Sequence, residues 1–114
     1  MLDINYSSIS FGAKFDSKAS ERLLDSVKHC RGLKLGVEAR LAHIREWGNP
    51  DSVILLSKDK TTSAERFVLK NDKFGDKEVA ISKQIDSGWH SIVMAFFDVT
   101  KNAINQAEKI LMKG

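Results

Sequence analysis

The longest regular pattern of apolar and polar positions lies at the C-terminal end of the chain. With 100° between successive residues, as in a helix, the apolar side chains of this segment fall within an arc of about 160°. They are Trp89, Ile92, Val93, Phe96, Phe97, Val99, Ala103, Ile104, Ala107, Ile110 and Leu111, while Met94, Ala95 and Met112 interrupt the pattern. The pattern predicts one amphipathic helix about 37 Å long, capped at its start by Asp86 or Ser87 and with Phe96 in the core.

A first helix is predicted after residue 16. Asp16 and Ser17 carry side chains of the kind that cap free backbone N–H groups at a helix start. The apolar residues that follow at helical spacing are Leu23, Leu24, Val27 and Cys30. Gly32 is the natural stop. Cys30 is therefore expected on the buried face of this helix.

Two other segments in the first half of the chain are harder to assign. Residues 2–15 alternate between apolar and polar, with a shift of one position at Ser7-Ser8, and are expected to be extended with a bulge or tight turn. Residues 33–47 fit both a strand-like alternation and a helical stripe. Their composition favours a helix over 37–47, ended by Gly48-Asn49-Pro50, and leaves a short strand over 33–37 open.

Three short segments that follow are typical of strands. They are residues 53–57, 66–70 and 78–83, and polar connections with turn-forming residues join them into a predicted antiparallel meander. The chain is expected to form one α+β domain over residues 1–114 in the order β-α-(α)-β-β-β-α. An antiparallel sheet of about four strands would be packed by an N-terminal helix or helix pair and by the long C-terminal helix.

Composition narrows the class of protein. The chain has 114 residues, of which 42% are hydrophobic, so it can bury a core. Its one cysteine excludes an internal disulfide and a cysteine-rich zinc site, and favours a reducing, cytoplasmic location. The first residues lack the pattern of a signal peptide. No apolar run approaches the roughly 20 residues that a transmembrane helix needs, so no membrane association is expected.

Candidate catalytic arrangements are weak. Cys30 follows His29 directly, but adjacent helix residues point about 100° apart, so they do not form a nucleophile–base pair. The histidines at positions 29, 43 and 90 are too widely spaced for a local metal pair. Glu65, Glu78 and Lys83 are loosely compatible with a small metal-dependent hydrolase or nuclease, which is the least supported interpretation. We therefore expect a non-enzymatic protein with no cofactor and no metal.

The basic residues support an alternative function as a nucleic-acid-binding regulator. The chain has 18 Lys and Arg against 15 Asp and Glu, a net charge of +3, and the acidic residues are interleaved with the basic ones. The basic side chains that could contact phosphates lie near the end of the first helix and on the strand connections. They are Lys28, Arg31, Lys34, Lys70, Lys73 and Lys77.

The C-terminal helix carries more apolar surface than a small sheet needs for cover. Aromatic residues and methionine are enriched where protein interfaces lose water, and the predicted interface residues are Trp89, Met94, Phe97 and Met112. Met94 and Met112 are expected to point away from the core, in line along one helix. These features favour protein–protein binding, as an inhibitor, an adaptor, an immunity-type protein or an assembly subunit. The expected partner is another protein, which includes a second copy of the chain in a homo-oligomer.

Overall fold

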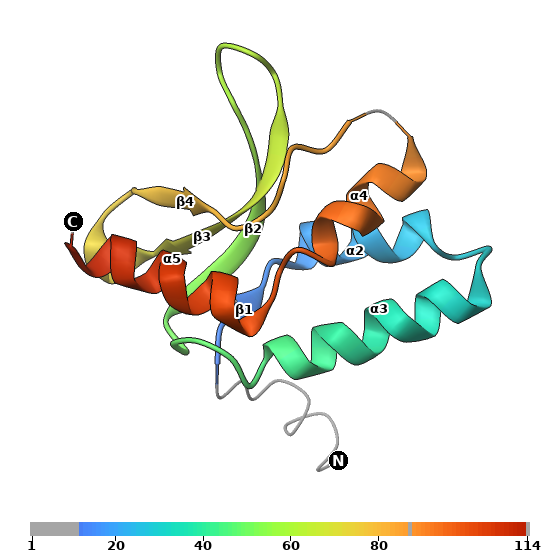
Figure 1. Ribbon diagram of the computed structural model, residues 1–114, viewed down its shortest axis with the longest axis horizontal. Helices are drawn as coiled ribbons and strands as arrows, with labels where there is room; N and C mark the ends of the chain where they lie inside the picture. Colours follow the sequence, from blue (N-terminus) through green and yellow to red (C-terminus); the bar gives the residue numbers. More distant parts are fainter. Residues whose placement is uncertain (1–11, 87, 114) are drawn as a thin grey trace.

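The computed structural model describes residues 12–86 and 88–113, and these residues form an α+β fold (Figure 1). The order is β1 (Lys14–Phe15), α2 (Ser17–Ser26), α3 (Arg31–Ile44), β2 (Ser52–Lys58), β3 (Glu65–Asn71), a 3-10 turn η1 (Asp72–Phe74), β4 (Glu78–Ala80), α4 (Trp89–Phe96) and α5 (Lys101–Lys113). Most of the extended segment expected over residues 2–15 lies outside the described residues, and its last part is β1.

The four strands lie in the order β1-β2-β3-β4. The predicted meander is confirmed, since β2, β3 and β4 pair antiparallel. The expectation of a fully antiparallel sheet is wrong at β1, which runs parallel to β2 and pairs Lys14 with Val53. Both α2 and α3 separate β1 from β2, and a helical crossover of this kind returns the chain to the starting end of the sheet, as parallel pairing requires.

Successive side chains in a strand point to opposite faces, which gives this sheet a covered face and an open face. Ile54, Phe67 and Leu69 are fully buried on the covered face and belong to the hydrophobic core. Helices α2, α4 and α5 pack against β2, β3 and β4 there. Val68 and Ala80 lie opposite each other on the other face and are outside the core cluster. In Figure 1 the β2–β3 hairpin extends well beyond the helices.

The first helix begins as predicted and ends early. The Asp16 carboxylate accepts a hydrogen bond from the Ala19 N–H at 3.1 Å, so Asp16 caps α2. The helix ends at Ser26, where the chain turns because the N–H groups of Val27 and Cys30 bond to carbonyls three residues earlier. Cys30 directly precedes α3 and is half-buried, so its expected place on the buried face of the first helix is wrong. Gly32 lies in the first turn of α3 and stops no helix.

Residues 31–44 form one helix, which confirms the helical interpretation and excludes the short strand over 33–37. The helix starts six residues before the predicted boundary, and its buried residues, Val37 and Ile44, both face the core from one side of it. It ends at Ile44 and not at Trp47. Gly48, with a φ of +76°, then turns the chain toward β2, as the predicted stop requires.

The prediction of a single long C-terminal helix is wrong, because the chain forms two helices, α4 and α5, with a break over residues 97–100. The break is held by polar contacts: the Asp98 carboxylate accepts the Lys83 N–H at 3.1 Å, and the Thr100 hydroxyl accepts the Ala103 N–H at 3.1 Å. The expected cap at Asp86 is also wrong, since Gly88 precedes α4 without a capping side chain, and the alternative cap, Ser87, lies outside the described residues. Phe96 is fully buried, as predicted.

Candidate functional site

The predicted interface residues are distributed over two helices. Met94 on α4 and Met112 on α5 are exposed, by 52% and 68%, as their positions on the helical wheel predicted. The break between α4 and α5 means that they do not continue one straight line along a single helix. Phe97 is half-buried in the break, where the Arg40 guanidinium lies 5.2 Å from its ring centre. The side chain of Trp89 lies outside the described part of the chain. Binding of a partner by these four residues stays a prediction.

The six basic residues of the nucleic-acid hypothesis form two separate groups. One group surrounds the turn between α2 and α3, and the other follows the end of β3, and Figure 1 places these turns at opposite sides of the molecule. Three members are already engaged with carboxylates: Lys28 with Asp25 at 3.0 Å, Lys70 with Asp72 at 3.9 Å, and Lys73 with Asp51 at 2.6 Å. The fold therefore gives them no common surface.

The residues considered for metal-dependent hydrolysis are also separated. Glu65 lies on the covered face, where it forms two hydrogen bonds with Arg22 of α2, at 2.7 and 2.8 Å. Glu78 lies on the open face and accepts a hydrogen bond from the Ser57 hydroxyl at 2.7 Å. Within residues 12–86 and 88–113, no group of three or more metal-binding side chains comes together.

The outer edge of β4 is the most distinctive feature that the fold creates. Among the described strands β4 is the last in the sheet, paired with β3 on one side. The Ile81 N–H donates to the Phe67 carbonyl at 2.9 Å, so Ile81 faces β3. Because bonded and non-bonded pairs alternate in an antiparallel ladder, Val79 faces β3 as well. The backbone N–H and C=O groups of Glu78 and Ala80 therefore point away from the sheet.

A groove of about 300 Å³ lies on the covered side of this edge, between β4 and α5. We call it the helix-side groove. Its apolar walls are Val79 and Ile81 from the strand side and Ala103 and Ile110 from α5. Ile110 is 46% exposed although it belongs to an amphipathic helix. The groove therefore presents uncovered apolar surface beside free backbone groups.

A second groove of about 550 Å³ lies on the other side of the same edge. We call it the open-face groove. It is lined by residues of β2, β3, β4 and the β2–β3 connection, namely Ser57, Lys58, Asp59, Lys60, Thr62, Ala64, Arg66, Val68, Glu78 and Ala80. Ala80 lines both grooves, so the free edge of β4 runs between them.

The open-face groove is lined by three cationic side chains, Lys58, Lys60 and Arg66, and by two carboxylates, Asp59 and Glu78. The Asp59 carboxylate accepts hydrogen bonds from the N–H and hydroxyl of Thr61, at 2.8 and 2.7 Å, and these bonds hold the pKa of Asp59 below its ordinary value. Lys58, Lys60 and Arg66 form no ion pair within 4 Å among the described residues. Three cationic side chains therefore remain available to a carboxylate that enters the groove.

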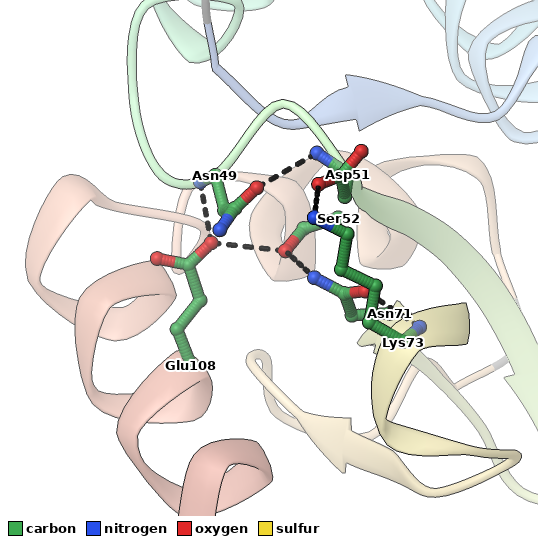
Figure 2. A network of polar contacts seen from close by, with 6 residues as sticks. All are labelled: Asn49, Asp51, Ser52, Asn71, Lys73 and Glu108. Carbon is green, nitrogen blue, oxygen red and sulfur yellow. Dashed lines mark hydrogen bonds and ion pairs between the residues drawn. The ribbon is translucent and has the colours of Figure 1, made fainter.

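A polar network joins α5, which forms one wall of the helix-side groove, to the sheet (Figure 2). Glu108 projects from α5 toward the start of β2, where its carboxylate accepts the Ser52 hydroxyl at 2.9 Å. The Asn71 side-chain amide donates to the same hydroxyl at 3.4 Å. Ser52 and Asn71 are both buried, and the Asp51–Lys73 ion pair flanks them at the surface.

Sequence reasoning missed this site because strand order cannot be read from the chain itself. The alternation over residues 78–83 indicated a strand but not that it would be an edge.

Comparison of the chain with protein-family models, with curated proteins and with solved structures found no match. Among the described residues, no helix combines the length and the apolar character that crossing a membrane would require.

Proposed function

We propose that this protein is a non-enzymatic, cytoplasmic binding domain that takes up an extended segment of a partner protein along the free edge of β4. The observation that carries the proposal is the position of Ala80, whose outward backbone groups lie between two grooves. The proposal is compatible with the role of an inhibitor, an adaptor, an immunity-type protein or an assembly subunit.

The binding mechanism would be strand addition. An extended segment that pairs with an exposed sheet edge gains main-chain hydrogen bonds, and its alternate side chains enter pockets on the two sides of the new strand. Glu78 and Ala80 would supply the main-chain bonds. The helix-side groove would receive one set of side chains, covering Ile110 and Val79, and the open-face groove would receive the other.

The size of the edge sets the expected strength. β4 has 3 residues, so only a few hydrogen bonds can form, each worth about 0.5–1.5 kcal/mol net. The remaining affinity must come from apolar contact in the helix-side groove, at roughly 25 cal/mol per Å² of apolar surface buried. Binding is therefore expected to be transient and of moderate affinity, as is usual for small interfaces.

The test uses a capped peptide in which Val alternates with Thr, titrated into ¹⁵N-labelled protein. Saturable shifts of the amide signals of Glu78 and Ala80, with slower hydrogen exchange, are the expected result. Ala80→Pro removes the outward N–H and should weaken binding about tenfold, since it deletes one bond and introduces a steric clash. Ala80→Ser keeps the N–H and serves as the matched control.

Two outcomes would overturn the proposal. One is peptide binding that is the same in Ala80→Pro and Ala80→Ser, both folded by circular dichroism. The other is concentration-dependent dimerisation in sedimentation velocity that Ala80→Pro abolishes, because the occupant of the edge would then be a second copy of the chain.

A further inference from the structure

We propose that the segment taken up at β4 alternates apolar residues with acidic residues, so that its apolar face enters the helix-side groove and its carboxylates enter the open-face groove. This inference rests on the proposed function and adds the chemistry of the partner to it. It follows from the different characters of the two grooves that flank one strand edge.

The alternation itself is a consequence of strand geometry. Side chains of an added strand would point alternately to the covered and the open side of the sheet, because they follow the same pleat as β4. The side chains on the covered side would meet Val79, Ile81, Ala103 and Ile110, which offer apolar contact. Aliphatic side chains are the class that these four walls favour, because they bury apolar surface against them.

Arg66 determines the preference on the open side. The register of β3 with β4 pairs Val68 with Ala80, and its continuation would place Arg66 level with Ser82. At this level the ladder is interrupted, because the Ser82 hydroxyl, and not a backbone carbonyl, accepts the Phe67 N–H at 3.0 Å. Arg66 is exposed on the open face: it pairs with Ser57 of β2, and on the β4 side the described chain next bridges β3 at Ile85, opposite Glu65. An added strand that continues past Ala80 would bring a side chain beside this guanidinium.

A carboxylate is the group that this position fits. A guanidinium binds a carboxylate through two parallel hydrogen bonds, which adds directionality to the attraction between the charges. Lys58 and Lys60 line the same groove and add to the positive potential. The groove also contains two carboxylates, Glu78 and Asp59, and the charge of Arg66 acts on Asp59, but neither carboxylate forms an ion pair with Arg66 within 4 Å.

The experiment compares three capped peptides in which Val alternates with Glu, with Thr or with Lys. The wild-type protein should bind the Glu peptide about fivefold more tightly than the Thr peptide, and the Lys peptide most weakly. Arg66→Glu should reverse the order of the Glu and Lys peptides. Lys109→Glu changes the net charge equally from an exposed position on α5 that lines neither groove, and it should keep the wild-type order.

The outcomes separate this inference from the proposed function. Equal binding of the Glu and Lys peptides, with binding still weakened by Ala80→Pro, would overturn the acidic preference and leave strand addition standing. Binding of all three peptides that is unaffected by Ala80→Pro would overturn both. An equal effect of Lys109→Glu and Arg66→Glu would assign the preference to the net charge of the protein and would overturn the role of the open-face groove. In about 0.5 M NaCl the advantage of the Glu peptide should shrink.

Discussion

The carboxylate of Glu108 and the hydroxyl of Ser52 lie 2.9 Å apart, although 56 residues separate them in the chain. Glu108 also accepts the backbone N–H of Asn49, in the loop before β2. These bonds join the last helix to the start of the first long strand. The Glu108–Ser52 contact therefore holds the helix that forms one wall of the helix-side groove.

Replacement of Glu108 should therefore destabilise the protein. Glu108→Ala removes a charged acceptor and leaves the buried Ser52 hydroxyl without this partner, so we expect a loss of about 1.5–3 kcal/mol in the free energy of unfolding. Lys109→Ala, on the exposed neighbouring residue, should change it by less than about 0.5 kcal/mol. Urea denaturation followed by circular dichroism measures both. Equal effects of the two substitutions would show that the polar network around Glu108 does not contribute to the free energy of unfolding.

The start of α5 provides a second prediction. The Thr100 hydroxyl accepts the Ala103 N–H, which otherwise has no partner inside the helix. Thr100→Ala should cost about 1 kcal/mol, the usual loss at an N-terminal cap, while Thr100→Ser should restore most of it. Thermal unfolding of both variants measures the difference. If Ser and Ala at this position were equally destabilising, the methyl group of Thr100 and not its hydroxyl would hold the helix start.

Thr100 and the two residues before it explain why the prediction of one long C-terminal helix was wrong. The apolar stripe continues in phase across residues 97–100, so periodicity carries no signal of a break. Asp98, Val99 and Thr100 are weak helix formers. Their effect becomes decisive through distant partners, since Lys83 and Arg40 bond to Asp98 and to the Val99 carbonyl. Contacts of this kind cannot be read from local sequence.

The meander was predictable and the candidate site was not. Short apolar runs over residues 53–57 and 66–70, with a polar connection between them, are a local signal that defined β2 and β3 within one residue at each end. The free edge of β4 depends on which strands end up beside one another, and the groove depends on how α5 crosses the sheet. Both are set by the packing of Phe67, Phe96 and Ile104 in the core and not by any local motif.

The Arg22–Glu65 pair predicts a pH dependence. Hydrogen bonding to Arg22 lowers the pKa of Glu65 below its ordinary value of 4.5. The ionised carboxylate thus stabilises the folded state above pH 4.5, and this contribution is lost as the pH falls through the lowered pKa. Glu65→Gln should cost less than about 1 kcal/mol at pH 7, because the Arg22 side chain is half-exposed and solvent screens the pair.

Urea denaturation at a series of pH values tests this sign. The difference between wild type and Glu65→Gln should be largest near neutral pH and should close in acid. Glu21→Gln, which removes an exposed carboxylate from the same helix as Arg22 and leaves the Arg22–Glu65 pair intact, is the matched control. If the difference in the free energy of unfolding between wild type and Glu65→Gln grew in acid, the stabilising role of the Arg22–Glu65 pair would be contradicted.

Substitutions in the core and on the surface of α4 should differ widely in their effect on the free energy of unfolding. The Phe96 ring lies 5.7 Å from Phe15 and 6.1 Å from Phe67, so it joins α4 to β1 and β3 at the centre of the core. Phe96→Ala should cost about 3–5 kcal/mol, the usual range for a deleted buried ring. Met94 lies two residues earlier and is 52% exposed. Met94→Lys should therefore leave the free energy of unfolding within about 0.5 kcal/mol of wild type.

Urea denaturation measures both effects, and sedimentation velocity shows whether Met94 also contributes to association. Under strand addition at β4, Met94→Lys should bind the alternating peptides as wild type does, because Met94 lines neither groove. Loss of peptide binding in a folded Met94→Lys protein would instead place the interface on the exposed face of α4. A Phe96→Ala protein as stable as wild type would contradict the position of α4 in the core, because deleting a buried ring that lies against Phe15 and Phe67 leaves a cavity that costs stability.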